Sequence, residues 1–221
     1  TVRKHIHRSM FLVRPFTPPD REGVRHIYGD DEFARPEMQR RFPHMSAYLA
    51  DSMLHYYDLE PESTFVAVMD GQVGGALLGA IDTERKDEQF QRHVKPLLLK
   101  RTLSGAYGWP AWLWADLLTD LAGRNADRPS IDLGQFPAHL HMGILPEWRR
   151  KGIGNSLVEG YESYLRSRGV PGYHLYASSF HPMGVAFYRK IGLETIGQFE
   201  WRFHDGYRWL DVLETIFARR L

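Results

Sequence analysis

Residues 144–157 read Ile-Leu-Pro-Glu-Trp-Arg-Arg-Lys-Gly-Ile-Gly-Asn-Ser-Leu. A predicted strand, Ala138–Leu145, ends in this stretch, and a predicted amphipathic helix, Gly152–Arg168, begins in it. The first amides of a helix have no partner within the helix, and the helix dipole adds partial positive charge there. Gly152 and Gly154 leave room for an approaching group, and three basic residues precede them. The stretch is therefore predicted to bind an anion such as a pyrophosphate.

Two familiar phosphate-binding motifs do not fit this stretch. It lacks the Gly-Lys-Ser/Thr ending of a P-loop, and Gly152-Ile-Gly154 lacks the third glycine of a dinucleotide fingerprint. On this stretch alone, a basic turn before an amphipathic helix remains the alternative interpretation. The chain carries 28 Lys and Arg against 27 Asp and Glu, a formal charge of +1. Because Arg149–Lys151 is a short cluster on a balanced chain, no nucleic-acid partner is expected.

The composition of the 221 residues excludes several classes of protein. There is no cysteine, which excludes disulfides, thiolate zinc sites, iron–sulfur clusters and a cysteine nucleophile. No run approaches about 18 consecutive apolar residues, and no signal-peptide pattern follows the basic first residues. We therefore expect a soluble, cytoplasmic protein without a membrane partner, folded as one domain over residues 1–221.

Strand and helix patterns alternate along the chain. The hairpin signal is the clearest, because Asp70-Gly71 separates two β-rich runs and suits a type I′ turn. A helix between strands 138–145 and 173–177 predicts a parallel βαβ unit. The class is mixed α/β. The other predicted strands are 11–13, 65–69, 73–81, 195–203 and 207–217; the other helices are 18–28, 36–57 with a break near Pro43, 84–100 with a break near Pro96, and a short one from His181-Pro182 to Gly192.

Residues 83–135 are predicted to form a helical insertion within the domain, because about 50 residues are marginal for independent folding. Three tryptophans, Trp109, Trp112 and Trp114, gather in its second half. They either wall an acceptor pocket or dock the insertion onto the domain.

A second motif follows the loop by about thirty residues: Val185-Ala-Phe-Tyr-Arg-Lys-Ile-Gly-Leu193. Together with Arg149-x-x-Gly152-x-Gly154, it resembles the GNAT family of acyl-CoA-dependent N-acetyltransferases, with Leu193 in the usual Phe position. The resemblance implies a mostly antiparallel, twisted sheet with a central parallel strand pair, flanked by helices. Residues 138–146 and 169–175 resemble, more narrowly, bacterial relatives of the acetyltransferase-like C-terminal domain of O-GlcNAcase.

The resemblance also implies roles for particular residues. Tyr188 would protonate the departing thiolate; its alternative is a buried aromatic that packs on the sheet. His181 stands where the family has an Asn that contacts the cofactor. The residues implied to hold acetyl-CoA are Met142, Gly143 and Ile144 through their backbone, then Arg149, Arg150, Lys151, Gly152, Ile153, Gly154 and Asn155.

The general base is less defined. An amine with a pKa near 10.4 must lose a proton before it attacks a thioester. His139 and His141 alternate on one predicted strand and share a face, so either could accept that proton or simply bond to its neighbours. Asp82 and Glu84 are other candidates. A metal site at the two histidines lacks a recognisable third ligand, so no metal is expected.

The resemblance therefore predicts transfer of an acetyl group from acetyl-CoA to a primary amine, by direct attack in a ternary complex. The acceptor would be a small molecule or a peptide. The alternative is a non-catalytic CoA-binding or interaction module. Whether the chain is a monomer or a homodimer remains open.

Overall fold

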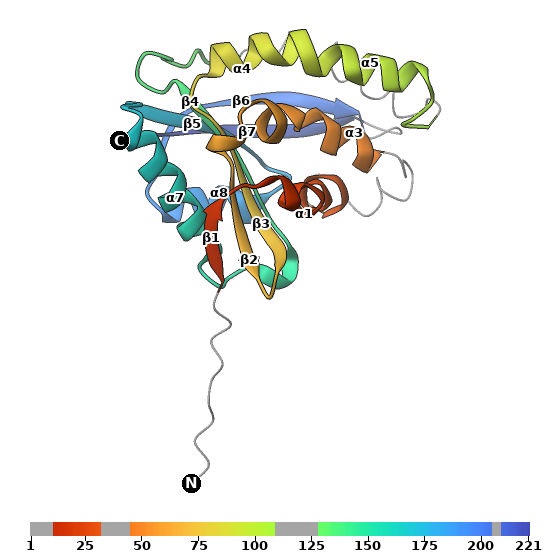
Figure 1. Ribbon diagram of the computed structural model, residues 1–221. Coiled ribbons are helices and arrows are strands. Elements are labelled where there is room, and N and C mark those ends of the chain that lie inside the picture. The colour runs from red at the N-terminus through yellow and green to blue at the C-terminus, as the bar shows by residue number, and fades with distance from the viewer. Residues whose placement is uncertain (1–10, 32–44, 109–127, 205–208) are drawn as a thin grey trace.

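The computed structural model describes residues 11–31, 45–108, 128–204 and 209–221. Seven strands form one sheet in the order β1-β2-β3-β4-β5-β7-β6 (Figure 1). Neighbouring strands are antiparallel except β4 and β5, which are parallel. The mixed α/β prediction is thus confirmed. The strands are β1 Leu12–Pro15, β2 Phe65–Met69, β3 Gln72–Ala80, β4 Ala138–Ile144, β5 Gly172–Ser178, β6 Glu194–His204 and β7 Trp209–Arg220.

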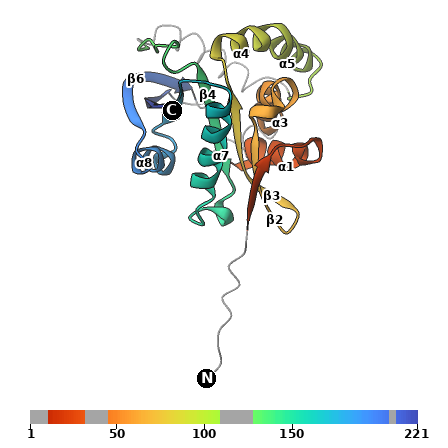
Figure 2. The ribbon, with the colours of Figure 1, turned by 60° about the vertical axis from the view of Figure 1, so that its left-hand side comes forward.

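Helices cover both faces of this sheet (Figures 1 and 2). Helices α7 and α8 lie on one face, and α1, α3 and the π-turn η3 lie on the other. The helices are α1 Arg21–His26, α3 Met45–Ser52, α4 Thr83–Gln89, α5 Lys95–Leu103, α7 Ile153–Ser167 and α8 Pro182–Lys190; the shorter turns are η1 Pro18–Asp20, η2 Ile27–Asp31, η3 His55–Leu59, η4 Pro61–Ser63, η5 Phe90–Val94 and η6 Pro146–Trp148.

The hairpin between β2 and β3 forms as predicted. Asp70 and Gly71 have φ angles of 53° and 76°, the two positive values that a type I′ turn requires. The turn fixes the register in which β3 lines up with β4 on its other side.

The N-terminal helix also begins as predicted. The Thr17 amide donates to the Asp20 carboxylate at 2.8 Å, and Asp20 also accepts two bonds of 2.7 Å from Arg14. The predicted helix 36–57 appears as α3 followed by η3; its expected break near Pro43 lies outside the described residues.

The break expected near Pro96 takes a milder form. Helices α4 and α5 follow one another through the π-turn η5, and they run along the top of the view in Figure 1. The Lys95 amide donates to the Phe90 carbonyl five residues earlier, and Pro96, which has no amide, lies in the first turn of α5. Proline lacks a donor and its ring crowds the carbonyl four residues earlier; here the helix widens locally before Pro96 instead of ending. Trp109, Trp112 and Trp114 lie outside the described residues.

Helix α7 packs its apolar face on the sheet. Ile153, Leu157, Tyr161 and Leu165 are all at most 1% exposed, and the Tyr161 hydroxyl donates to the carbonyls of Ala80 and His139 at 3.0 Å. This packing fixes the start of α7, and with it the loop that precedes the helix, relative to the end of β4. None of the described helices is long and apolar enough to cross a membrane.

Candidate active site

The two parallel strands pair over only part of their length. The register between β4 and β5 contains two pairs, Ala138 with Tyr173 and His139 with His174, although each strand has seven residues. Beyond these pairs the structure records no further pairing between the two strands. Met142 and Gly143 therefore lie on a stretch of β4 that pairs with β3 alone.

The amides of the loop after β4 lack backbone partners within the described part of the chain. Among the described residues, the amides of residues 150–155 donate to no backbone carbonyl, and the helical pattern begins with the Ser156 amide, which donates to the Gly152 carbonyl at 3.2 Å. Gly152 has a φ of +88°, and a Cβ atom built on it would meet no heavy atom within 4 Å. Arg150 has a φ of 60°, an uncommon value for a residue with a side chain. The turn therefore presents amides beside open space, which suits an anion.

The side chains of the same loop bind it to the sheet. Trp148 is buried, and its indole ring covers Gly74 of β3 so closely that a Cβ atom there would lie 1.9 Å from the ring. Arg149 Nε donates to the Ile144 carbonyl at 2.9 Å. This bond directs the Arg149 side chain back to the strand end, and the cofactor contact predicted for Arg149 stays a prediction.

A methyl group at Gly74 is expected to displace Trp148. We expect Gly74→Ala to lower the free energy of unfolding by about 1–3 kcal/mol, because overpacking forces the ring or the strand to move. Chemical denaturation measures this loss. Gly184→Ala is the control, since its Cβ atom would meet only His181 Cβ, at 3.9 Å. Equal effects of both substitutions would contradict the contact.

Helix α8, which carries Tyr188, packs on the start of α7 through Phe187. A Cβ atom on Gly154 would lie 3.0 Å from Phe187 Cζ, so the first turn of α7 packs directly on α8. The Tyr188 ring is buried, with its centroid 5.3 Å from that of Phe187 and 5.7 Å from that of Phe217. His181, half-buried, precedes α8 as its N-terminal cap residue.

His139 and His141 lie side by side on the other face of the sheet. Their ring centroids are 4.7 Å apart, and the His139 ring is 5.1 Å from that of His174 on β5. His139 Nδ1 shares a hydrogen bond of 3.2 Å with the Tyr56 hydroxyl. Strand register places Phe217, which contacts Tyr188, on the face opposite to these histidines. The two groups of residues thus flank the sheet at the point where β4 and β5 stop pairing.

The histidines are held neutral. Burial lowers the pKa of His139 well below its usual value, and it lowers the pKa of His141 to about 3. The positive charge of Lys86 contributes to both shifts. Either imidazole can therefore accept a proton at neutral pH, but it does so as a weak base.

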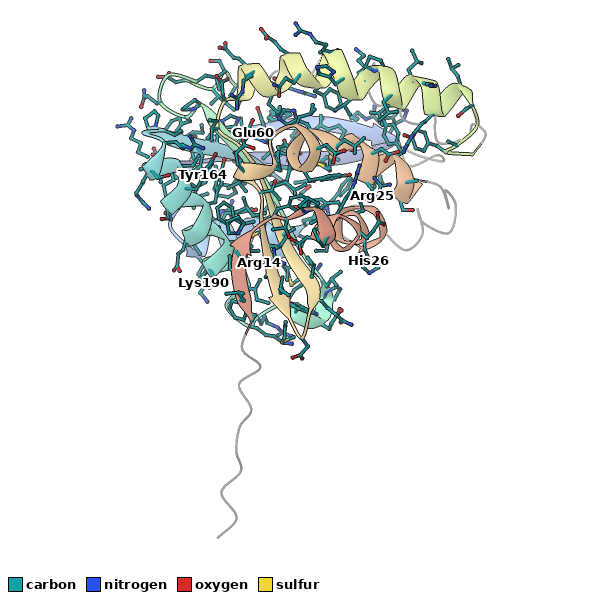
Figure 3. The ribbon with its side chains drawn as sticks, viewed as in Figure 1. Arg14, Arg25, His26, Glu60, Tyr164 and Lys190 are labelled. Carbon is teal, nitrogen blue, oxygen red and sulfur yellow. The ribbon has the colours of Figure 1, made fainter. Side chains whose placement is uncertain are left out.

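Of the acidic candidates, Asp82 has a structural partner and Glu84 is exposed; a further carboxylate, Glu60, is buried nearby. Asp82 accepts a hydrogen bond of 3.0 Å from the Arg85 amide and so caps α4, and Glu84 is exposed on that helix. Glu60, labelled in Figure 3, is buried and accepts bonds from the Ile81 amide and Ser63 Oγ at 2.7 and 2.8 Å. Among the described residues, no three His, Asp or Glu side chains stand close enough together to hold a metal ion.

Comparison with known proteins agrees with this geometry. Residues 123–193 match the model of the acetyltransferase (GNAT) family. A 68-residue stretch is 29% identical to an acetyltransferase of Pectobacterium atrosepticum, covering 29% of this chain and 48% of that protein. The chain thus spans about half the length of the curated relative that it matches. The crystal structure of SsHAT superposes with a TM-score of 0.67 at 25% identity, over 95% of this chain and 98% of the other. The chain is thus similar to acetyltransferases of the GNAT family over residues 123–193 and shares its fold with a solved structure over nearly its whole length.

More distant structures share the GNAT fold alone. Ard1 from Thermoplasma volcanium has a TM-score of 0.52 at 16% identity, over 96% of this chain and 97% of that one. A ribosomal-protein-alanine N-acetyltransferase from Brucella melitensis has a TM-score of 0.52 at 17% identity, over 95% and 99%. The residues matched by the GNAT family model include the whole turn after β4 and helix α8.

Sequence reasoning missed one carboxylate on the histidine face of this GNAT fold. Glu214 on β7 accepts a hydrogen bond of 3.1 Å from Trp201 Nε1. Burial raises the pKa of Glu214, against the smaller lowering effects of the Trp201 bond and the Arg128 charge. The alternation of β7 could have revealed it, because Glu214 shares its parity with Val212 and Ile216, both at most 1% exposed.

The neutral histidines predict how stability depends on pH. Their folded-state pKa values lie below the unfolded value of about 6.5, so protonation favours the unfolded chain. Stability is therefore complete above about pH 6.5 and falls as the pH drops toward 3. For His141, whose folded-state pKa is about 3, the loss at pH 5 is about 2 kcal/mol. Urea denaturation at pH 7.5 and pH 5 measures it, and His141→Gln is expected to flatten the slope; an unchanged slope would assign the dependence to other groups.

Proposed function

We propose that this chain transfers an acetyl group from acetyl-CoA to a primary amine. The observation that carries the proposal is the open turn at Gly152, whose amides have no backbone partner among the described residues and which follows the part of β4 that does not pair with β5. Its alternative, a basic turn without a ligand, accounts less well for this backbone, because Arg150 holds a positive φ at a cost in strain.

The residues of the turn fit the pyrophosphate of coenzyme A. The amides of residues 150–155 would bind the phosphate oxygens, with Lys151 and Arg150 adding positive charge. The backbone of Met142 and Gly143 would pair with the pantetheine arm along the part of β4 that lacks pairing with β5. Ile144 already gives its carbonyl to Arg149, so its contribution would come from its amide. His181 would be a further contact from α8.

The transfer requires three groups around the thioester. The amine nitrogen attacks the carbonyl carbon, a C–N bond forms, and the C–S bond breaks. The nitrogen loses one proton to a base, and the thiolate gains one from an acid, so that the products are an amide and a free thiol. Tyr188 is the proposed acid, because α8 packs against the first turn of α7. His139 or His141, directly or through water, is the proposed base on the opposite face.

The narrower resemblance extends the proposal. Residues 138–146 and 169–175 favour a relative of the bacterial proteins akin to the C-terminal domain of O-GlcNAcase. Within that subgroup we propose a small-molecule or peptide amine as acceptor and a single domain over residues 1–221, with residues 83–135 as an insertion.

Free-thiol release from acetyl-CoA, measured across a panel of primary amines, tests the proposal. We expect amine-dependent release that stops when the amine is left out. Binding of coenzyme A is measured in parallel by thermal shift. Binding without release for every amine would favour the alternative, a non-catalytic CoA-binding module. No binding at all would refute both.

A further inference from the structure

One carboxylate on the histidine face is only half-buried. Glu214 Oε2 accepts the Trp201 bond, while no donor among the described residues reaches Oε1. The side chain therefore keeps part of its surface in contact with solvent. Burial makes the charged form of this carboxylate unfavourable, and a bound cation would relieve that cost.

Aromatic rings surround this carboxylate. Phe199 pairs directly with Glu214 across β6 and β7, and the Tyr176 ring meets the Phe199 ring edge-on, with centroids 6.3 Å apart. Tyr176 is 41% exposed although it lies in a central strand. The guanidinium carbon of Arg128 lies 5.5 Å from the Phe199 centroid. These rings therefore already attract one cation, as aromatic faces do. We call Tyr176, Phe199, Trp201 and Glu214 the aromatic patch.

The aromatic patch adjoins the proposed reaction centre. The Tyr176 centroid is 6.0 Å from that of His139 and 5.9 Å from that of His174. Glu214 is one strand further, because β7 lies beyond β5. An acceptor that reaches the gap between β4 and β5 over this face would extend across the patch.

Glu214 suits a second cationic group better than it suits the attacking amine. A carboxylate beside an ammonium raises the pKa of that ammonium, and the attacking nitrogen must lose its proton. The groups nearest the gap, His139 and His141, are neutral and do not hold the nitrogen in its charged form. Glu214 on β7, which would contact the second cation, is thus separated by strand β5 from the histidines of β4, where the attacking nitrogen loses its proton.

We propose that the aromatic patch is an acceptor subsite that binds a second cationic group, so that the preferred acceptor is a primary amine carrying a further ammonium or guanidinium. This inference rests on the proposed acetyl transfer. It assigns to Tyr176 and Trp201 the aromatic contacts with the cation, and to Glu214 its counter-charge; Phe199, which is buried and already carries Arg128 over its ring, supports Tyr176 from beneath.

Two matched amines test the subsite: 1,5-diaminopentane and pentylamine, which differ only in the second ammonium. We expect kcat/KM, measured by thiol release, to be about tenfold higher for the diamine. Glu214→Gln is expected to lower kcat/KM for the diamine until the two amines are used about equally. The control is Glu200→Gln, which removes the same charge from an exposed side chain of β6 next to Phe199 and Trp201 in sequence, on the opposite face. Equal use of both amines, or equal loss for both in Glu214→Gln, would overturn the inference while acetyl transfer stands.

A binding measurement separates the subsite from the reaction. Tetramethylammonium cannot be acetylated. Its binding is followed by NMR through the indole N–H signal of Trp201, which is assigned as the signal that is missing from the spectrum of Trp201→Phe. We expect saturable binding that weakens about tenfold in Glu214→Gln and persists in Glu200→Gln. If tetramethylammonium binds in this way but no amine is acetylated, the cation site is supported and the proposed acetyl transfer is refuted. Absence of binding would refute the site whatever the activity.

Discussion

Tyr188→Phe is expected to lower kcat by about a hundredfold or more, because a positioned general acid contributes 10²–10⁴ in rate. The substitution keeps the ring, and with it the contacts to Phe187 and Phe217, and removes only the hydroxyl. Affinity for coenzyme A should change little. Steady-state kinetics of thiol release gives kcat, and calorimetric titration with coenzyme A gives the affinity.

Tyr164→Phe is the matched control. Tyr164 lies on α7 (Figure 3), and its hydroxyl is buried without a hydrogen-bond partner among the described residues. Removing that hydroxyl should leave kcat and affinity unchanged. If Tyr188→Phe reduces kcat and the affinity for coenzyme A by the same factor, then Tyr188 serves packing and another group protonates the thiolate. The same conclusion follows if both losses are explained by a lower free energy of unfolding.

Much of the fold could be predicted from local sequence, because its signals are short-range. Asp70-Gly71 requires a type I′ turn, and Thr17 with Asp20 forms a cap, whatever lies elsewhere in the chain. The predicted break of the helix near Pro96 was wrong in detail. The sequence shows that Pro96 lacks an amide, but whether a helix ends or widens depends on packing against other elements, and α5 packs on α3.

The site was predictable where a motif carries it and not where register creates it. The glycines of residues 152–154 and Tyr188 can be read from the motifs. The early end of pairing between β4 and β5 cannot be read from the sequence, because two strands of equal length give no sign of where they separate. Glu214 and Tyr176 are 38 residues apart and meet only through the pairing of β5, β7 and β6. The direction of the Arg149 side chain likewise depends on the Ile144 carbonyl.

Gly152→Leu is expected to weaken binding of coenzyme A by about tenfold or more. A side chain at this position would project into the open space beside the outward amides, where the pyrophosphate is proposed to bind. The substitution also forces a residue with a Cβ atom into a φ of +88°, which costs roughly 1–2 kcal/mol of stability. The loss of affinity must therefore be separated from this strain.

Gly169→Leu provides that separation. Gly169 follows the other end of α7, has a φ of +68°, and likewise has no heavy atom within 4 Å of a built Cβ atom. It should lose similar stability in chemical denaturation and keep its affinity for coenzyme A in calorimetric titration. Because the two glycines share backbone conformation and open surroundings, a difference in affinity alone reports on the ligand. If both variants bind coenzyme A as tightly as the parent protein, the turn after β4 does not hold the pyrophosphate, and the proposed orientation of the thioester toward Tyr188 is wrong.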